Sequence, residues 1–141
     1  MRMPLTDRLS GDIKRVEADL MLARSAAVKP FGLTVPQFAA LLWLEDSPGV
    51  SPAELARRCR VTPQTMTTIL RNLRTLGHVE RTPHPFHRSM LQTRLTESGA
   101  RTVAEADARA AAVEQRLAAE FTDEERDQLR ALLARCSSAL K

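Results

Sequence analysis

Apolar residues recur every three or four positions along most of the chain, which is the spacing of amphipathic helices. The pattern predicts six helices, at about residues 5–28, 34–46, 51–58, 62–76, 96–119 and 122–140. Two short segments near 78–82 and 90–95 are instead predicted as strands, because prolines between them mark a turn. We therefore expect a mainly α protein with one small β-hairpin.

The predicted helix starts carry Ser or Thr, whose side-chain oxygen can accept a backbone N–H of the first turn. Thr34, Ser51 and Thr122 each stand three residues before a Gln or Glu, which is the capping-box spacing. Pro52 and Pro63 fall at the first helical position, where the missing N–H costs nothing. These signals set the starts of most of the predicted helices.

Positive charge is concentrated in the middle of the chain. Between Ser51 and Arg101 there are nine arginines and three glutamates, a net charge of +6. The rest of the chain holds twelve basic and fourteen acidic residues, a net charge of −2. A polyanionic partner would explain this partition, and a solvated arginine-rich surface is the alternative.

Length and hydropathy limit the class of protein. A chain of 141 residues predicts one domain with a real core. The apolar runs are too short to span a membrane, and the N-terminus carries charges where a signal peptide needs an apolar stretch. We expect a cytoplasmic protein with no membrane partner.

Residues able to carry catalysis or bind metal are few. Cys59 and Cys136 lie far apart in helical apolar patterns, which predicts reduced, unreactive thiols. His84 and His87, with His78 and Cys59, could be drawn as zinc ligands, but the two-histidine spacing lies in a Pro-rich loop without a nearby acid. Nothing beside the cysteines supplies an orienting acid or oxyanion donors. We therefore expect no metal, no cofactor and no enzymatic activity.

The segment 62–76 has two contrasting faces. Its apolar positions are Met66, Ile69, Leu70, Leu73 and Leu76, and its polar positions are Gln64, Thr65, Thr67, Thr68, Arg71 and Arg74. Gln can pair with adenine, a Thr methyl can touch the thymine methyl, and Arg can reach guanine or a phosphate. An ordinary solvent-facing helix is the alternative. The capped helix before this segment, the short turn at 60–62 and the basic hairpin after it favour a helix that reads duplex DNA.

These pieces occur in the order SPAELARRCRVTPQTMTTILRNLRTLGHVER, then RTPHPFHRSM, then LTESG, and in this order the chain resembles the MarR family of winged helix-turn-helix transcription regulators. The resemblance runs from about Leu33 to Gly99, and the flanking helices fit it. It implies one domain, 1–141, with a DNA-binding lobe at 34–96 and dimerisation helices at 5–30 and 97–141. It also implies a homodimer on a pseudo-palindromic operator. Members of the family often sense small aromatic or phenolic effectors.

The polar face and the resemblance together give the expected site residues. The recognition helix 62–76 would enter the major groove, and the wing 82–90 would lie along the backbone or minor groove. The expected DNA-binding residues are Ser51, Thr62, Gln64, Thr65, Thr67, Thr68, Arg71, Arg74, Arg81, His87 and Arg88. Apolar stripes at the two ends predict a dimer interface that contains Leu5, Leu9, Ile13, Leu129, Leu132, Leu133 and Cys136, with packing inside one monomer as the alternative. An effector cleft would contain Phe31, Phe38 and Trp43, which are otherwise core residues.

The wing departs from the family pattern R-x-P-D-P-x-D-R-R. His84 and His87 replace the two acids, and Ser89 replaces the arginine that enters the minor groove in the family. Arg88 could turn inward in its place, or the wing could contact phosphates only. Two histidines remove repulsion from phosphates, so we expect DNA affinity to rise as pH falls from about 8 to about 6. Exposed loop histidines without this role are the alternative.

Two further functions remain compatible with the sequence. One is a winged-helix protein whose altered wing has weakened its DNA affinity and which acts through protein–protein contacts. The other is a metal-responsive regulator that uses the histidines of the wing.

Overall fold

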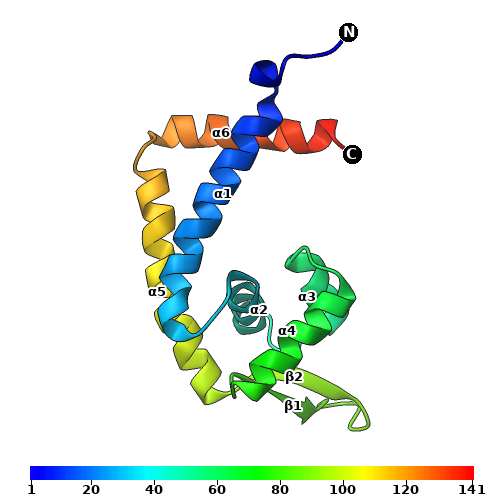
Figure 1. Cartoon of the computed structure of the whole chain (residues 1–141). Helices are drawn as coiled ribbons and strands as arrows, with labels where there is room; N and C mark the ends of the chain where they lie inside the picture. The colour runs from blue at the N-terminus through cyan, green and yellow to red at the C-terminus, as the bar shows by residue number, and fades with distance from the viewer.

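The computed structural model describes residues 1–141 and confirms a mainly α fold with one β-hairpin (Figure 1). In chain order, the elements are a 3₁₀ turn Leu5–Asp7, α1 Leu9–Val28, a 3₁₀ turn Lys29–Phe31, α2 Val35–Asp46, α3 Pro52–Arg58, α4 Pro63–Thr75, β1 Val79–Pro83, β2 Leu91–Leu95, α5 Glu97–Ala118 and α6 Asp123–Ala139. The strands pair antiparallel, with Val79 opposite Leu95 and Pro83 opposite Leu91. No helix alone is long and apolar enough to cross a membrane, although the bent pair Leu9–Phe31 and Val35–Asp46 meets the length and composition criteria when taken together.

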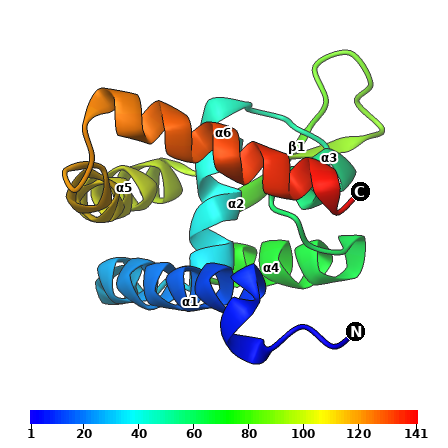
Figure 2. The ribbon, with the colours of Figure 1, turned by 90° about the horizontal axis from the view of Figure 1, so that it is seen from above.

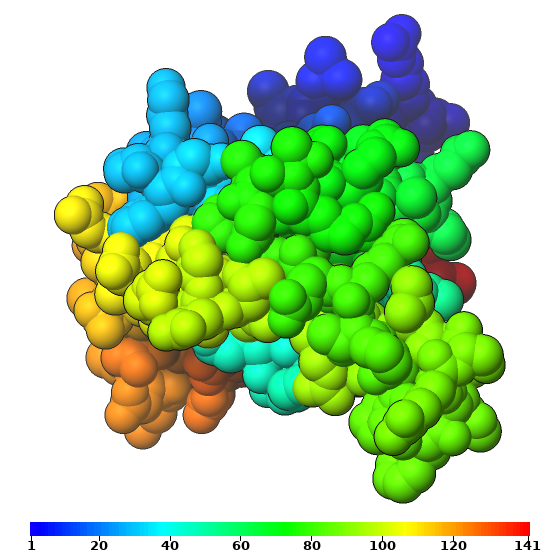
Figure 3. Space-filling view, turned by 90° about the horizontal axis from the view of Figure 1, so that it is seen from below, coloured from blue at the N-terminus to red at the C-terminus, as the bar shows by residue number.

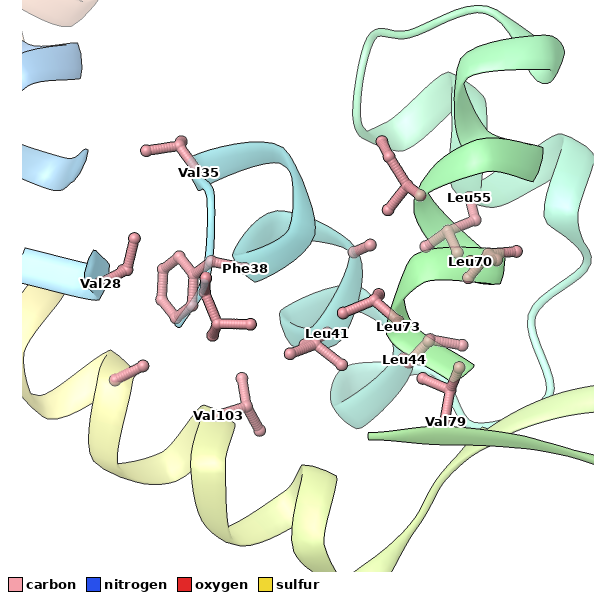
Figure 4. Packing of buried hydrophobic residues seen from close by; sticks show 14 of the residues in the cluster. Val28, Val35, Phe38, Leu41, Leu44, Leu55, Leu70, Leu73, Val79 and Val103 are labelled. Carbon is pink, nitrogen blue, oxygen red and sulfur yellow. The ribbon is translucent and has the colours of Figure 1, made fainter. Parts of the chain in front are cut away.

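The hydrophobic core surrounds α2. Phe38, Leu41 and Leu44 of this helix are almost fully buried. They face Val103 of α5 on one side and Leu73 of α4 on the other (Figure 4). Because α2 packs against α4, α5 and β2, the position of α4 relative to the hairpin is set by one continuous core.

The two ends of the chain lie far from the hairpin. α1 and α5 contact each other and extend away from the lobe that contains α2, α3, α4 and the hairpin. α6 continues from the far end of α5 and runs across that end of the molecule, apart from α1 when seen from above (Figures 1 and 2). No residue of α6 is buried, and Val28 is the only buried residue of α1. The side chains of Leu5, Leu9, Ile13, Leu129, Leu132 and Leu133 are 39–75% exposed. Packing within one monomer therefore does not account for these apolar stripes.

Two sequence predictions about helix limits are wrong. The first helix begins at Leu9, because Arg8 is extended (φ −89°, ψ 113°) and separates it from the turn at Leu5–Asp7. Leu76 was expected on the buried face of its helix, yet it is 49% exposed. Leu76 caps the end of the helix, still with helical backbone angles (φ −74°, ψ −10°), and the chain then turns away through Gly77 at φ +80°.

The caps predicted at helix starts are confirmed. Thr34 and Thr122 form complete capping boxes. Three further caps accept the backbone N–H three residues on, namely those of Ser51, Thr62 and Thr96. The reciprocal half of the box at Ser51 is absent, because the carboxylate of Glu54 binds Arg57 and Arg58 instead.

Candidate nucleic-acid interface

Helix α4 lies on the outer face of the lobe, with the hairpin projecting beside it (Figure 3). Thr62 caps its start and Pro63 occupies its first position. Met66, Ile69, Leu70 and Leu73 are buried, as predicted. The opposite face leaves seven polar residues exposed, namely Gln64, Thr65, Thr67, Thr68, Arg71, Asn72 and Thr75. The helix therefore presents a continuous polar surface to a partner.

Two threonines of this face, Thr67 and Thr68, use their hydroxyl hydrogens within the helix. Thr67 Oγ1 donates to the carbonyl of Pro63 at 3.0 Å, and Thr68 Oγ1 donates to that of Gln64 at 3.4 Å. With those hydrogens already engaged, each threonine offers a partner its methyl group and an acceptor oxygen. The side chains of Gln64 and Arg71 make no hydrogen bond, so their donors are free for a partner.

The arginines of the basic segment fall into two groups. Arg57 and Arg58 pair with Glu54, and these contacts, chiefly the hydrogen bond from Arg58, hold the pKa of that carboxyl below its usual value. Arg94 and Arg101 bond to Gln92 and Glu97. The other five form no side-chain hydrogen bond or ion pair, namely Arg60, Arg71, Arg74, Arg81 and Arg88. Unneutralised charge thus lies on the turn before α4, on α4 and on the hairpin.

A recess of about 240 Å³ lies between α4 and the hairpin. It is lined by Pro52, Thr67, Leu70, Arg74, Arg81, Leu91 and Thr93. Arg74 is half-buried, and Thr93 is only 6% exposed although its hydroxyl makes no hydrogen bond. Two guanidinium groups and a free hydroxyl around one recess suit an anion with several oxygens, such as a phosphodiester.

The recess unites three expected residues with one that sequence reasoning missed. Thr67, Arg74 and Arg81 are expected to bind DNA, and Thr93 is not. In a strand, every second residue faces the same side. The alternation of Leu91, Thr93 and Leu95 could therefore have placed Thr93 on the inner face of the hairpin.

A histidine that was not expected in the site holds the turn of the hairpin. The Nδ1 atom of His84 accepts the backbone N–H groups of Phe86 and His87, both at 3.1 Å. Nδ1 can accept only in the neutral imidazole, so this turn requires an uncharged His84. His87 and Arg88 are exposed beyond it. In the family pattern this position is an acid, and its replacement by His84 was the sequence signal that this residue organises the turn.

Ser51 and Thr62 have local structural roles. Each side-chain oxygen accepts a backbone N–H of the helix that it caps, Ser51 from Glu54 and Thr62 from Thr65. Ser51 also directly precedes Pro52, which lines the recess. Both residues therefore lie at helix starts on the same lobe as the arginines.

The expected effector cleft does not form as one surface. Phe38 is 1% exposed and points into the core (Figure 4), so it cannot line a cleft with the other two. Phe31 packs partly against that core. Trp43 is 37% exposed and lines a separate recess of about 550 Å³ with Arg24, Ala39, Leu42, Glu45 and Asp46. The guanidinium carbon of Arg58 lies 5.2 Å from the centre of its ring.

Cysteine and histidine side chains form no cluster. No three His, Cys, Asp or Glu residues come together in a way that could hold a metal ion, so His78, His84, His87 and Cys59 do not share a site. Burial raises the pKa of the Cys59 thiol, which favours its unreactive protonated form.

The chain is similar over nearly its whole length to proteins of one family. A model described as the MarR family matches residues 31–88. The HTH-type transcriptional repressor Rv2887 of Mycobacterium tuberculosis is 39% identical over 124 residues, which are 88% of this chain and 89% of that protein.

Solved structures give the same result. Rv2887 in complex with DNA is 36% identical with a TM-score of 0.69, covering 92% of this chain and 97% of that one. CouR from Rhodococcus jostii RHA1 bound to p-coumaroyl-CoA is 26% identical with a TM-score of 0.83, covering 94% and 93%. The extent of these matches, together with the helix-turn-helix and hairpin described above, shows that the chain belongs to the MarR family.

Proposed function

We propose that this chain is a transcriptional repressor that binds a pseudo-palindromic operator as a homodimer and that has no enzymatic activity. The observation that supports this most directly is the polar face of α4 flanked by arginines without ion-pair partners. The relative Rv2887 carries the name of a repressor and has been solved with DNA.

In this proposal α4 enters the major groove. Gln64 pairs with an adenine edge, the methyl groups of Thr67 and Thr68 contact thymine methyls, and Arg71 reaches a guanine or a phosphate. The sugar–phosphate strand that separates the major from the minor groove then passes between α4 and the hairpin. One of its phosphates occupies the recess of Arg74, Arg81 and Thr93.

A second copy of the chain covers the exposed apolar residues of α1 and α6. Leu9, Ile13 and Leu132 are 70%, 44% and 52% exposed, which is unusual for a helical stripe that has no partner. Cys136 lies half-buried on the same helix as Leu132. To read one operator, the two copies of α4 in this dimer must lie about 34 Å apart, one turn of B-form DNA.

The recess beside Trp43 is the proposed effector site. A planar aromatic acid can stack on the Trp43 ring while its carboxylate pairs with Arg24. Structures of Rv2887 with salicylic acid and p-aminosalicylic acid, both aromatic acids, support this ligand class. Because Arg58 of α3 contacts Trp43 and donates to Ser47 at 2.8 Å, a ligand that moves Trp43 would also disturb the start of the DNA-binding unit.

Selection of bound genomic fragments by the purified protein, followed by mobility-shift titration, tests the DNA-binding proposal. We expect nanomolar-range binding to a few inverted repeats and a large loss of it in Gln64→Ala with Arg71→Ala. Arg109→Ala, an equal charge change on the exposed side of α5, should bind normally. Binding that shows no sequence preference would instead favour the altered-wing protein that acts through protein contacts.

The effector proposal has a direct optical test, because Trp43 is the only tryptophan of the chain. Salicylate should quench its fluorescence in a saturable way and release the operator over the same concentration range. Arg24→Ala should weaken both effects, and Lys29→Ala, which removes a neighbouring charge that does not line the recess, should weaken neither. Operator release without any change in Trp43 emission would place the effector elsewhere.

A further inference from the structure

We propose that Phe86, at the tip of the hairpin, is an apolar wedge that enters the minor groove next to each operator half-site and partly unstacks one base step. The proposal rests on the proposed function, because it requires the protein to bind duplex DNA through α4. It adds a contact, a deformation of the DNA and a sequence preference that the α4 contacts do not provide.

The position of Phe86 leaves its ring without a protein partner. Its side chain is 85% exposed, although phenylalanine is among the residues most often buried. Most of the other large exposed apolar residues lie on α1, on α6 or at the chain ends beside them, away from the hairpin (Figures 1 and 2). Met90 and Leu91 are also exposed, on the hairpin itself. A dimer formed by α1 and α6 would therefore not cover Phe86.

The turn that carries Phe86 is held in one shape by hydrogen bonds. The His84 ring accepts the N–H groups of Phe86 and His87, and the His84 N–H donates to the carbonyl of Met90 at 2.9 Å. The Met90 N–H donates to the carbonyl of His87 at 2.8 Å. The rings of His84 and Phe86 lie 6.1 Å apart between centres. A wedge ordered in advance loses little conformational entropy on insertion.

Charge around the turn favours DNA over an apolar protein surface as the occupant. Arg81 and Arg88 flank Phe86 and form no ion pair, and the chain has no acidic residue between Glu80 and Glu97. If a backbone phosphate occupies the recess between α4 and the hairpin, the hairpin tip lies on the far side of that strand from the major groove. That far side is the minor groove, where apolar side chains of other proteins wedge between bases.

Unstacking costs least at flexible pyrimidine–purine steps, chiefly TA and CA/TG. The proposal therefore predicts such a step at a fixed distance outside the bases that α4 reads, on both sides of the operator. Every TA or CA/TG step contains a thymine, and an unstacked thymine reacts readily with permanganate. This makes the wedge observable at single-base resolution.

The test is permanganate footprinting of the full-length protein on its selected operator, with mobility-shift affinities measured on the same duplex. The wild type should make one thymine per half-site hyperreactive. Phe86→Ala should remove that reactivity and weaken binding about tenfold, since burial of the ring and the cost of unstacking partly offset each other. Phe86→Leu should keep part of both effects. Leu76→Ala, which removes another exposed apolar side chain of the same lobe, should change neither.

The possible results separate the wedge from the function on which it rests. Tight operator binding without hyperreactive thymines, or with thymines that stay hyperreactive in Phe86→Ala, refutes the wedge and leaves the DNA-binding function intact. Absence of specific DNA binding by the wild type refutes both. If Phe86→Ala keeps normal DNA binding and footprint but loses a protein contact, the tip is a protein-docking surface and the wedge is wrong. Circular dichroism of each variant checks that it is folded.

Discussion

Arg81→Ala should lower the dependence of operator affinity on salt by a predictable amount. Arg81 lines the recess between α4 and the hairpin and has no carboxylate partner, so a DNA phosphate is its proposed counter-charge. Each phosphate neutralised on B-form DNA contributes about 0.9 to the slope of log affinity against log salt concentration. A dimer loses two such contacts, and the slope should therefore become less negative by about 1.8.

This change in slope determines how far the loss of operator affinity in Arg81→Ala varies with salt concentration. Between 50 and 200 mM salt, a slope difference of about 1.8 corresponds to a factor of about 12. The affinity deficit of Arg81→Ala relative to the wild type should thus be about 12-fold smaller at the higher salt concentration. The assay is a mobility-shift or fluorescence-anisotropy titration of one operator at four or more salt concentrations.

Two matched variants make the result interpretable. Arg109→Ala removes the same charge from the exposed side of α5 and should leave the slope unchanged. Thr93→Val removes only the hydroxyl from the recess, so it should keep the slope but weaken binding by about 30-fold, from about 1 kcal/mol per lost hydrogen bond in each of two subunits. A slope for Arg81→Ala equal to that of the wild type would refute the placement of a phosphate in the recess.

Two other predictions concern stability and thiol reactivity. Gly99→Ala should lower the free energy of unfolding in urea by about 3 kcal/mol, because the added Cβ would meet the backbone carbonyl of His78. Gly11→Ala, in open space on α1, should cost nothing or stabilise the fold by about 0.5 kcal/mol. Equal effects of the two substitutions would contradict the close approach of α5 to the hairpin. In a Cys136→Ser background at pH 7.5, iodoacetamide should modify Cys59 much more slowly than it modifies free cysteine, because burial raises the pKa of this thiol. The rate should approach that of free cysteine only in denaturant. Rapid modification of the folded protein would show that the thiol is accessible.

Local interactions explain why much of the fold was predictable from the sequence. Helix caps need only a hydroxyl and the next turn of backbone, so Thr34, Thr62 and Thr122 mark helix starts wherever the helices pack. The buried face of α4 follows from the helical repeat, which also places Gln64 and Arg71 on the opposite face. The concentration of arginine in one segment is likewise a property of the chain itself.

Other features were decided only when distant segments met. The pair of Arg58 with Glu54 follows from their i,i+4 spacing on one helix, but the contacts of Arg58 with Trp43 and Ser47 join separate elements. The place of Arg81 beside the recess likewise depends on the packing of the hairpin against α4. The fate of an aromatic residue depends on what packs on it, and for this reason Phe38 is core while Trp43 lines a recess. The periodicity of apolar residues predicts which residues share a face, but the contacts of that face depend on how one element packs on another. The recess between α4 and the hairpin exists because a single core holds both elements in place.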